Sequence, residues 1–157
     1  ICLFGAELTY AGQNIKNFNF EKDTKNISRR YRDFLSILIM SLICKRFENG
    51  DTPYTAEEIS SEHKIPIRLT HHILDLLQEI NLIHELVADT KSDNILYLPS
   101  MDINKLNVAV LLERIDTNGS EDFKVDKEDE FQNHWHTLIE ARDLYQKKNS
   151  EILLKDL

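Results

Sequence analysis

The chain has few cysteines and few glycines, and each shortage excludes a class of functional site. Only two of its 157 residues are cysteine, Cys2 and Cys44, and both lie in apolar segments. A disulfide framework and a thiolate metal site are therefore excluded, and the chain suits a reducing compartment. Four glycines leave no room for a glycine-rich phosphate loop. No nucleophile elbow or Ser-His-Asp context is present either, so we expect no catalytic residue, no cofactor and no enzyme activity.

A positive charge balance is also missing. The formal net charge is −8 at pH 7, whereas free-standing nucleic-acid binders usually carry a basic surface. The charge is uneven along the chain, because acidic residues predominate after Tyr54. Between Ile15 and Asp33, in contrast, the basic residues Lys16, Lys22, Lys25, Arg29, Arg30 and Arg32 outnumber the acidic ones.

No apolar run reaches the roughly 20 residues that cross a bilayer. The chain nevertheless opens on the apolar stretch "ICLFGAELTYAGQN", which contains the single carboxylate of Glu7. No initiator Met and no basic region precede it, so a signal peptide is not expected. An apolar stub followed by Lys and Arg is typical of the cytoplasmic end of a membrane helix. The amphipathic first helix of a soluble protein is the alternative that charge alone leaves open.

From this pattern we expect residues 1–14 to be the end of a transmembrane helix and residues 15–27 to be a basic juxtamembrane linker. The expected membrane-proximal side chains are Glu7, Tyr10, Lys16, Arg29, Arg30 and Arg32.

The middle of the chain has the pattern of a winged helix. "ISRRYRDFLSILIMSLICKRF" carries apolar residues at helical spacing, with Ser28 as N-cap and Gly50 beyond the end. "TAEEISSEHKIP" predicts a short helix with a capping box of Thr55 and Glu58, and a second helix starts near Pro66. Two β-type runs, 82–87 and 95–98, flank a polar turn over 89–94.

The predicted fold is therefore mainly α with a small β-hairpin, a winged helix-turn-helix flanked by additional helices, with the winged-helix domain over 28–116. Beyond Pro99, "MDINKLNVAVLLERID" predicts a helix capped by Asp102. Residues 117–130 are expected to form an acidic loop. Residues 131–157 are expected to form a C-terminal helix followed by a short apolar piece.

The candidate interaction or DNA-facing residues lie in this motif. His71 and His72 stand near the start of the second helix, where a DNA reader places base-contacting groups. The basic residues of the motif are Lys64, Arg68 and Lys91. They face a larger acidic set, which would mostly repel phosphates, so nucleic acid is not expected as a partner: Glu57, Glu58, Glu62, Asp75, Glu79, Glu85, Asp89 and Asp93.

A metal site is not expected. His134 and His136 form an H-x-H pair, but on a helix the two side chains point about 200° apart and cannot chelate one ion. They are interpreted as solvent or interface histidines.

The opening stretch resembles a known membrane family. "FGAELTYAGQN", with its Gly5-Ala6-Glu7 core, resembles the end of the last membrane helix in the YihY/BrkB family of polytopic bacterial inner-membrane proteins. The segments that resemble the soluble tail of that family are "ISRRYRDFLSILI", "YTAEEISSEHKIPIRLTHHILDLLQEINLI", "YLPSMDINKLNV" and "NSEILLKDL". The resemblance implies an inner-membrane protein with this domain on the cytoplasmic side, next to its own N-terminal membrane domain and to the membrane surface.

The YihY/BrkB family has historically carried the label ribonuclease BN. A zinc-dependent tRNA nuclease needs a metal motif rich in histidine and aspartate, and this sequence contains none. A nuclease activity is therefore not supported by the residues.

The middle segment also resembles the winged-helix core of a class of bacterial repressors, in which "TAEEIA…IP…IL..L...GLI" precedes a wing and a Y-x-L strand. Some of those repressors carry iron–sulfur cysteines after the wing. This chain has no cysteine there, so cluster sensing is not expected.

Three functions follow for testing. The main hypothesis is a regulatory or interaction module of a membrane protein, a homo-oligomer that uses its acidic surface and its long apolar helix to dimerise or to recruit a partner. The alternative is a winged-helix transcription regulator that binds duplex DNA through the helix containing Arg68, His71 and His72. The third is a ribonuclease.

Overall fold

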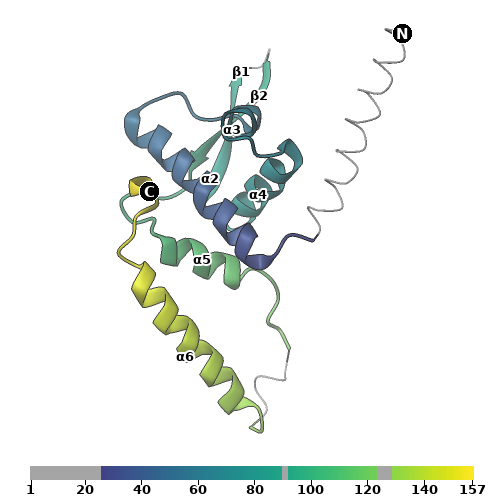
Figure 1. Ribbon diagram of the computed structural model, residues 1–157, viewed down its shortest axis with the longest axis vertical. Helices are drawn as coiled ribbons and strands as arrows, with labels where there is room; N and C mark the ends of the chain where they lie inside the picture. Colours follow the sequence, from purple (N-terminus) through teal and green to yellow (C-terminus); the bar gives the residue numbers. More distant parts are fainter. Residues whose placement is uncertain (1–25, 90–91, 124–128) are drawn as a thin grey trace, which may run out of the picture.

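The computed structural model describes residues 26–89, 92–123 and 129–157, and it is mainly helical with one two-stranded hairpin (Figure 1). The predicted fold class, a winged helix-turn-helix with additional helices, is confirmed. The predicted membrane stub over 1–14 lies outside the described residues, as do Glu7, Tyr10, Lys16 and Lys91.

The central element is helix α2 (Arg29–Asn49), which contacts α4, α5, β2 and η2. It begins where Ser28 Oγ accepts a hydrogen bond from the Tyr31 N–H at 3.1 Å, and it ends at Gly50, whose φ of 73° is left-handed. Both predicted ends are confirmed. Its core side chains are Leu35, Ile39, Met40, Ile43 and Cys44. The helix therefore has neighbours on several sides, as its broad apolar face predicted.

The aromatic residues of α2 depart from the prediction. Tyr31, Phe34 and Phe47 continue the apolar spacing, yet each is half exposed, and the rings of Tyr31 and Phe34 lie 5.7 Å apart. The periodicity predicted which face of α2 is buried. The core covers only the middle of that face, so the aromatic rings near the two ends of the helix stay half exposed.

Helices α3 (Ala56–His63) and α4 (Ile67–Glu79) form the helix-turn-helix. The predicted capping box is present: the Thr55 N–H donates to Glu58 Oε2 at 3.0 Å, and the Glu58 N–H donates to Thr55 Oγ1 at 3.2 Å. Lys64 ends α3 in the left-handed conformation at φ 54°. Pro66 then precedes α4, as expected from its fixed φ. The two helices contact each other, and α4 also contacts α2 and β1.

The wing is an antiparallel hairpin of β1 (Ile83–Asp89) and β2 (Ser92–Pro99). Its strands are longer than the predicted runs, and the register is interrupted between Val87 and Asp89. The Tyr97 N–H donates to the main-chain oxygen of Tyr54 at 3.0 Å, so the segment before α3 runs beside the wing. Tyr97 is buried, whereas Val87, further out on the same face, is exposed.

Helix α5 (Val108–Asp116) begins later than predicted. Asn107 is its N-cap and accepts from the Val110 N–H at 2.9 Å. Asp102, the predicted cap, instead accepts from the Asn104 N–H at 2.9 Å and closes a separate turn. These hydrogen bonds to Asn104 lower the pKa of the Asp102 carboxyl.

Helix α6 (Gln132–Asn149) contacts α5 at one end and extends away from the winged helix at the other (Figure 1). None of its residues is buried. After it, the segment Ile152–Leu157, which contains the 3-10 helix η2 (Leu154–Asp156), returns to the body and contacts α2. We call it the return segment.

The return segment is attached by its backbone and by one buried side chain. The Val108 N–H donates to Ile152 O at 2.9 Å, and the Leu154 N–H donates to Leu106 O at 3.1 Å. The side chain of Leu154 is fully buried in the core. The segment that follows α6 is therefore tied to the winged helix.

Candidate nucleic-acid interface

The outer face of α4 presents the candidate side chains. Leu69, Ile73 and Leu77 bury one face of this helix against the core. Because α-helical residues repeat every 3.6 positions, Arg68, His71 and His72 then lie together on the opposite face, and all three are exposed. The predicted set is thus brought to one surface on the first two turns of the second helix of the motif.

The first turn of α4 also leaves backbone donors without a side-chain cap. No side-chain oxygen caps this helix, and its first turn contains no acidic residue. The first N–H with a carbonyl partner four residues back is that of Thr70, at 2.9 Å from Pro66 O. A helix start of this kind is electrostatically suited to an anion such as a phosphate group.

Lys64 is exposed at the turn between α3 and α4, immediately before this start. The acidic residues of α4 lie further along the helix. Asp75 is seven residues beyond Arg68, which is about 10 Å along the axis, and Glu79 is in the last turn. Positive and negative groups are therefore separated along α4.

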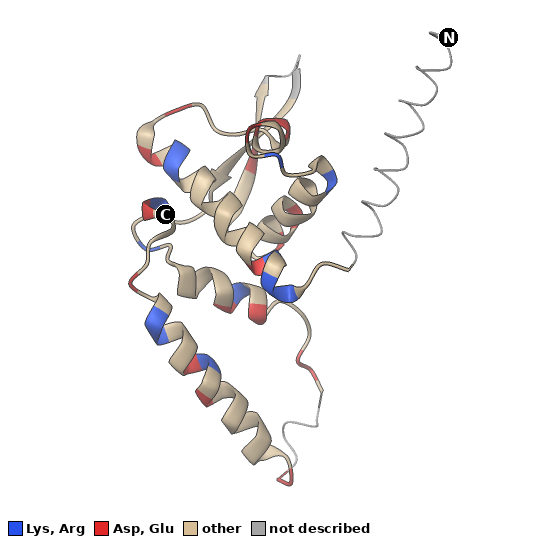
Figure 2. Ribbon diagram, in the orientation of Figure 1, with Lys and Arg blue, Asp and Glu red and all other residues tan. Residues whose placement is uncertain are grey.

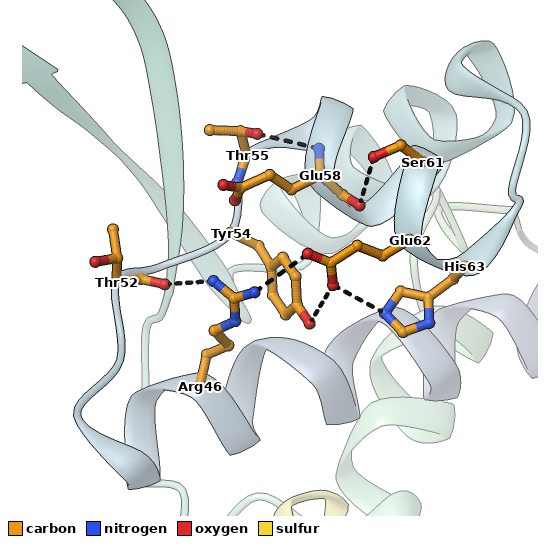
Figure 3. A network of polar contacts seen from close by, with 8 residues as sticks. All are labelled: Arg46, Thr52, Tyr54, Thr55, Glu58, Ser61, Glu62 and His63. Carbon is orange, nitrogen blue, oxygen red and sulfur yellow. Dashed lines mark hydrogen bonds and ion pairs between the residues drawn. The ribbon is translucent and has the colours of Figure 1, made fainter.

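A polar network holds α3 against α2 and so positions the helix-turn-helix (Figure 3). The guanidinium of Arg46 lies over the ring of Tyr54, with Cζ 3.7 Å from the ring centroid. Arg46 Nη2 is 3.5 Å from Glu62 Oε1, and Nη1 donates to Thr52 O at 3.0 Å. The Tyr54 hydroxyl donates to Glu62 Oε2 at 3.2 Å. His63 Nε2 is 3.9 Å from the same oxygen.

Tyr54 is the centre of this network. Its ring is buried, and burial is the main reason that its pKa is raised, while Arg46 acts in the opposite direction. Its main-chain oxygen accepts from Tyr97 in the wing. One residue therefore joins α2, α3 and the hairpin.

The far end of α4 is also fixed. Arg114 of α5 donates through Nη1 to the main-chain oxygens of Ile80 and Asn81, at 3.0 and 3.3 Å. The C-terminal end of α4 is thus held by a side chain of α5.

The network changes the interpretation of the acidic set. Figure 2 shows Asp and Glu interleaved with Lys and Arg along the chain rather than collected in one field. Glu58 is occupied in the capping box and Glu62 in the contacts with Arg46 and Tyr54. Composition alone counted both as free negative charges facing the DNA.

The basic residues at the start of α2 have local partners. Arg29 makes an ion pair with Asp116 of α5, and Arg142 of α6 lies 3.1 Å from the same carboxylate. Nearby, burial raises the pKa of Asp33 despite Arg29 and Arg32, and Asp33 Oδ1 is buried without a hydrogen-bond partner. This cluster joins α2, α5 and α6.

The cysteine and the H-x-H histidines do not form a metal site in the described residues. Cys44 is buried in the core, and burial together with Glu48 raises its thiol pKa to about 12. His134 and His136 are exposed on α6. Within the described ranges, no group of three or more His, Cys, Asp or Glu residues is placed to hold a metal ion.

Comparisons with known proteins identify the fold. No protein-family model matches the chain, and no curated protein matches its sequence. Among solved structures, IscR of T. potens matches with a TM-score of 0.55 at 14% identity, over 83% of both chains. CymR of Staphylococcus aureus matches with a TM-score of 0.54 at 14% identity, over 80% of this chain and 93% of that one. CymR of B. subtilis, described as the global cysteine regulator, matches with a TM-score of 0.55 at 14% identity, over 83% and 93%.

The fold is therefore a winged helix of the kind found in IscR and CymR. IscR and CymR are similar in fold to this chain over 80–83% of its length. The coverage extends well beyond the helix-turn-helix and wing.

These matches overturn the membrane interpretation. The resemblance to the YihY/BrkB family is wrong, and with it the inner-membrane location, the membrane-domain partner and the ribonuclease label. In the part of the chain that the structure describes, no helix is long and apolar enough to cross a membrane. The expectation that Arg29, Arg30 and Arg32 are membrane-proximal depended on that interpretation and is withdrawn.

The expectation that nucleic acid is not a partner is wrong for the same reason. It depended on the net charge and on a count of acidic residues. The resemblance of the "TAEEI…IP" segment to bacterial repressors was the better guide. The predicted self-association stays a prediction.

Proposed function

We propose that this chain is a transcription regulator that binds duplex DNA with α4 in the major groove. The observation that carries the proposal is the surface formed by Arg68, His71 and His72 on the first two turns of α4. In helix-turn-helix proteins the N-terminal residues of the second helix contact base edges. Lys64 and Lys91 are proposed to contact the phosphate backbone beside it. The likeness in fold to IscR and CymR supports the proposal. Catalysis is not part of it.

The side chains on this surface suit base recognition. Arginine donates two parallel hydrogen bonds to guanine O6 and N7, the commonest specific contact in the major groove. An imidazole donates or accepts according to its tautomer, so His71 and His72 can pair with either kind of base-edge group.

The small number of basic residues limits how strongly DNA binding should depend on salt concentration. Between Tyr54 and Leu98 the basic residues besides Arg68, which is assigned to a base, are Lys64 and Lys91, so the proposed interface neutralises about two phosphates per chain. The logarithm of the binding constant should then fall with the logarithm of salt concentration with a slope near −2 per bound chain. Binding without sequence preference should be weak, and discrimination between sequences should come from base contacts.

The experiment selects duplexes from a random library with the full chain and then measures affinity by fluorescence anisotropy over a range of salt concentrations. Replacement Arg68→Ala should weaken binding to the selected duplex by roughly 5- to 150-fold, the range for losing one bidentate base contact. The control Lys148→Ala removes an exposed charge from the last turn of α6 and should leave affinity within twofold. Failure to enrich any sequence, or equal losses for the two variants, would refute the proposal.

A further inference from the structure

Ile67 is an exposed apolar side chain next to the exposed polar residues of α4. It is the first residue of α4, directly after Pro66, and 39% of its surface is exposed. Within α4, all of whose residues the structure describes, no other large apolar side chain is exposed to this extent. Part of this side chain is therefore open to a binding partner.

The helical phase places Ile67 beside the DNA-facing surface. The buried stripe of α4 runs through Leu69, Ile73 and Leu77. Thr70 and Leu74 widen that buried face, and Ile67 stands three residues before Thr70 and seven before Leu74, so it lies at the edge of the face. Four residues advance an α-helix by about 400°, so Ile67 lies about 40° around the axis from His71 and one turn before it. It borders the surface formed by Arg68, His71 and His72.

The chemistry of base edges then limits what Ile67 can recognise. In the major groove guanine, adenine and cytosine present hydrogen-bond donors and acceptors. Thymine alone adds an apolar group, its 5-methyl. An isoleucine side chain has no hydrogen-bonding atom, so it gains free energy in the groove only by covering apolar surface.

We propose that Ile67 is a specificity-determining residue that packs against the 5-methyl group of one thymine in the DNA site. The inference rests on the proposed function, because it requires α4 to enter the major groove. Arg68 follows Ile67 in the sequence, so the thymine should lie within one or two base pairs of the guanine that Arg68 contacts. The expected preference is a modest one, because a single methyl group is involved.

The test replaces thymine by uracil, which removes the methyl group and leaves the hydrogen-bonding edge unchanged. Each thymine of the selected duplex is replaced in turn, and affinity for the full chain is measured by anisotropy. At one position the wild-type chain should lose about fourfold in affinity, the equivalent of burying one methyl group. The same replacement should change the affinity of the Ile67→Ala variant by less than 1.5-fold.

The control is a second isoleucine of matched exposure. Ile152 in the return segment is 41% exposed, and Ile152→Ala should retain the fourfold discrimination. The comparison of two side chains with two bases isolates the contact from effects of uracil on DNA shape. If no duplex is enriched at all, the proposed function itself fails. If a duplex is enriched but no thymine is preferred to uracil, or Ile67→Ala keeps the preference, only the inference about Ile67 is overturned.

Discussion

The attachment of the return segment leads to a prediction about Leu154. This side chain is fully buried, and it lies between backbone hydrogen bonds that join the segment to α5 and to the residues before it. Replacement Leu154→Ala removes three carbon atoms from the core and leaves a cavity. Substitutions of this kind cost about 2–5 kcal/mol, because the lost burial and the cavity add together.

The expected magnitude is near the middle of that range. The segment is short and has η2 as its only regular structure, so it can move inward to fill part of the space. We expect the free energy of unfolding to fall by about 3 kcal/mol. With a urea dependence of about 2 kcal/mol per molar, the unfolding midpoint should fall by about 1.5 M.

The assay is urea denaturation followed by circular dichroism, with Leu157→Ala as the matched control. Leu157 is in the same segment but is 53% exposed. Its replacement should change the free energy of unfolding by less than about 0.5 kcal/mol. Equal midpoints for the two variants would refute the packing of Leu154 in the core.

Three further predictions concern single side chains. Burial raises the pKa of Asp33 in the folded chain, so folding opposes ionisation there. Asp33→Asn should therefore increase the free energy of unfolding at pH 7, and the gain should shrink as the pH falls toward 4 and the wild-type carboxyl becomes protonated; a gain independent of pH would contradict this. The thiol pKa of Cys44, about 12, lies about three units above that of an ordinary cysteine. In a Cys2→Ser variant at pH 8, iodoacetamide should modify Cys44 about a thousandfold more slowly in the folded chain than in urea, and similar rates would show that the site is open. Lys64 has a left-handed backbone, with φ 54°, which glycine adopts more easily than lysine. Lys64→Gly should raise the melting temperature by about 2–4 °C in calorimetry, and a decrease would contradict the left-handed turn.

Local signals in the sequence predicted the fold well. The N-cap Ser28 and the Thr55–Glu58 capping box satisfy groups within a few residues, and Pro66 fixes its own φ, so their effects can be inferred without knowing the tertiary structure. The β-type runs likewise predicted the wing, although the strands extend further on both sides of the turn.

The start of α5 could not be predicted in this way. Asp102 and Asn107 are both good capping residues. The choice depends on distant contacts, because the Val108 N–H is bonded to Ile152, which comes 44 residues later in the chain. A local pattern contains no information about that partner.

The candidate site was predicted in part. Helical spacing placed Arg68, His71 and His72 together at the start of α4. It could not show that Glu58 and Glu62 were occupied by internal contacts, so the acidic count was taken as repulsion. Ile67 was missed, although its place between Pro66 and Arg68 at the start of α4 could have drawn attention to it.

The most direct test of the central claim is interference by guanine methylation. Methylation at N7 adds a group to the major-groove edge of guanine and blocks a side chain that binds there. We expect methylation of one or two guanines in the selected duplex to abolish binding of the wild-type chain. We also expect Arg68→Ala, which binds more weakly, to lose its sensitivity at one of them. Binding that is indifferent to N7 methylation at every guanine, or a pattern that is unchanged in Arg68→Ala, would contradict the placement of α4 in the major groove.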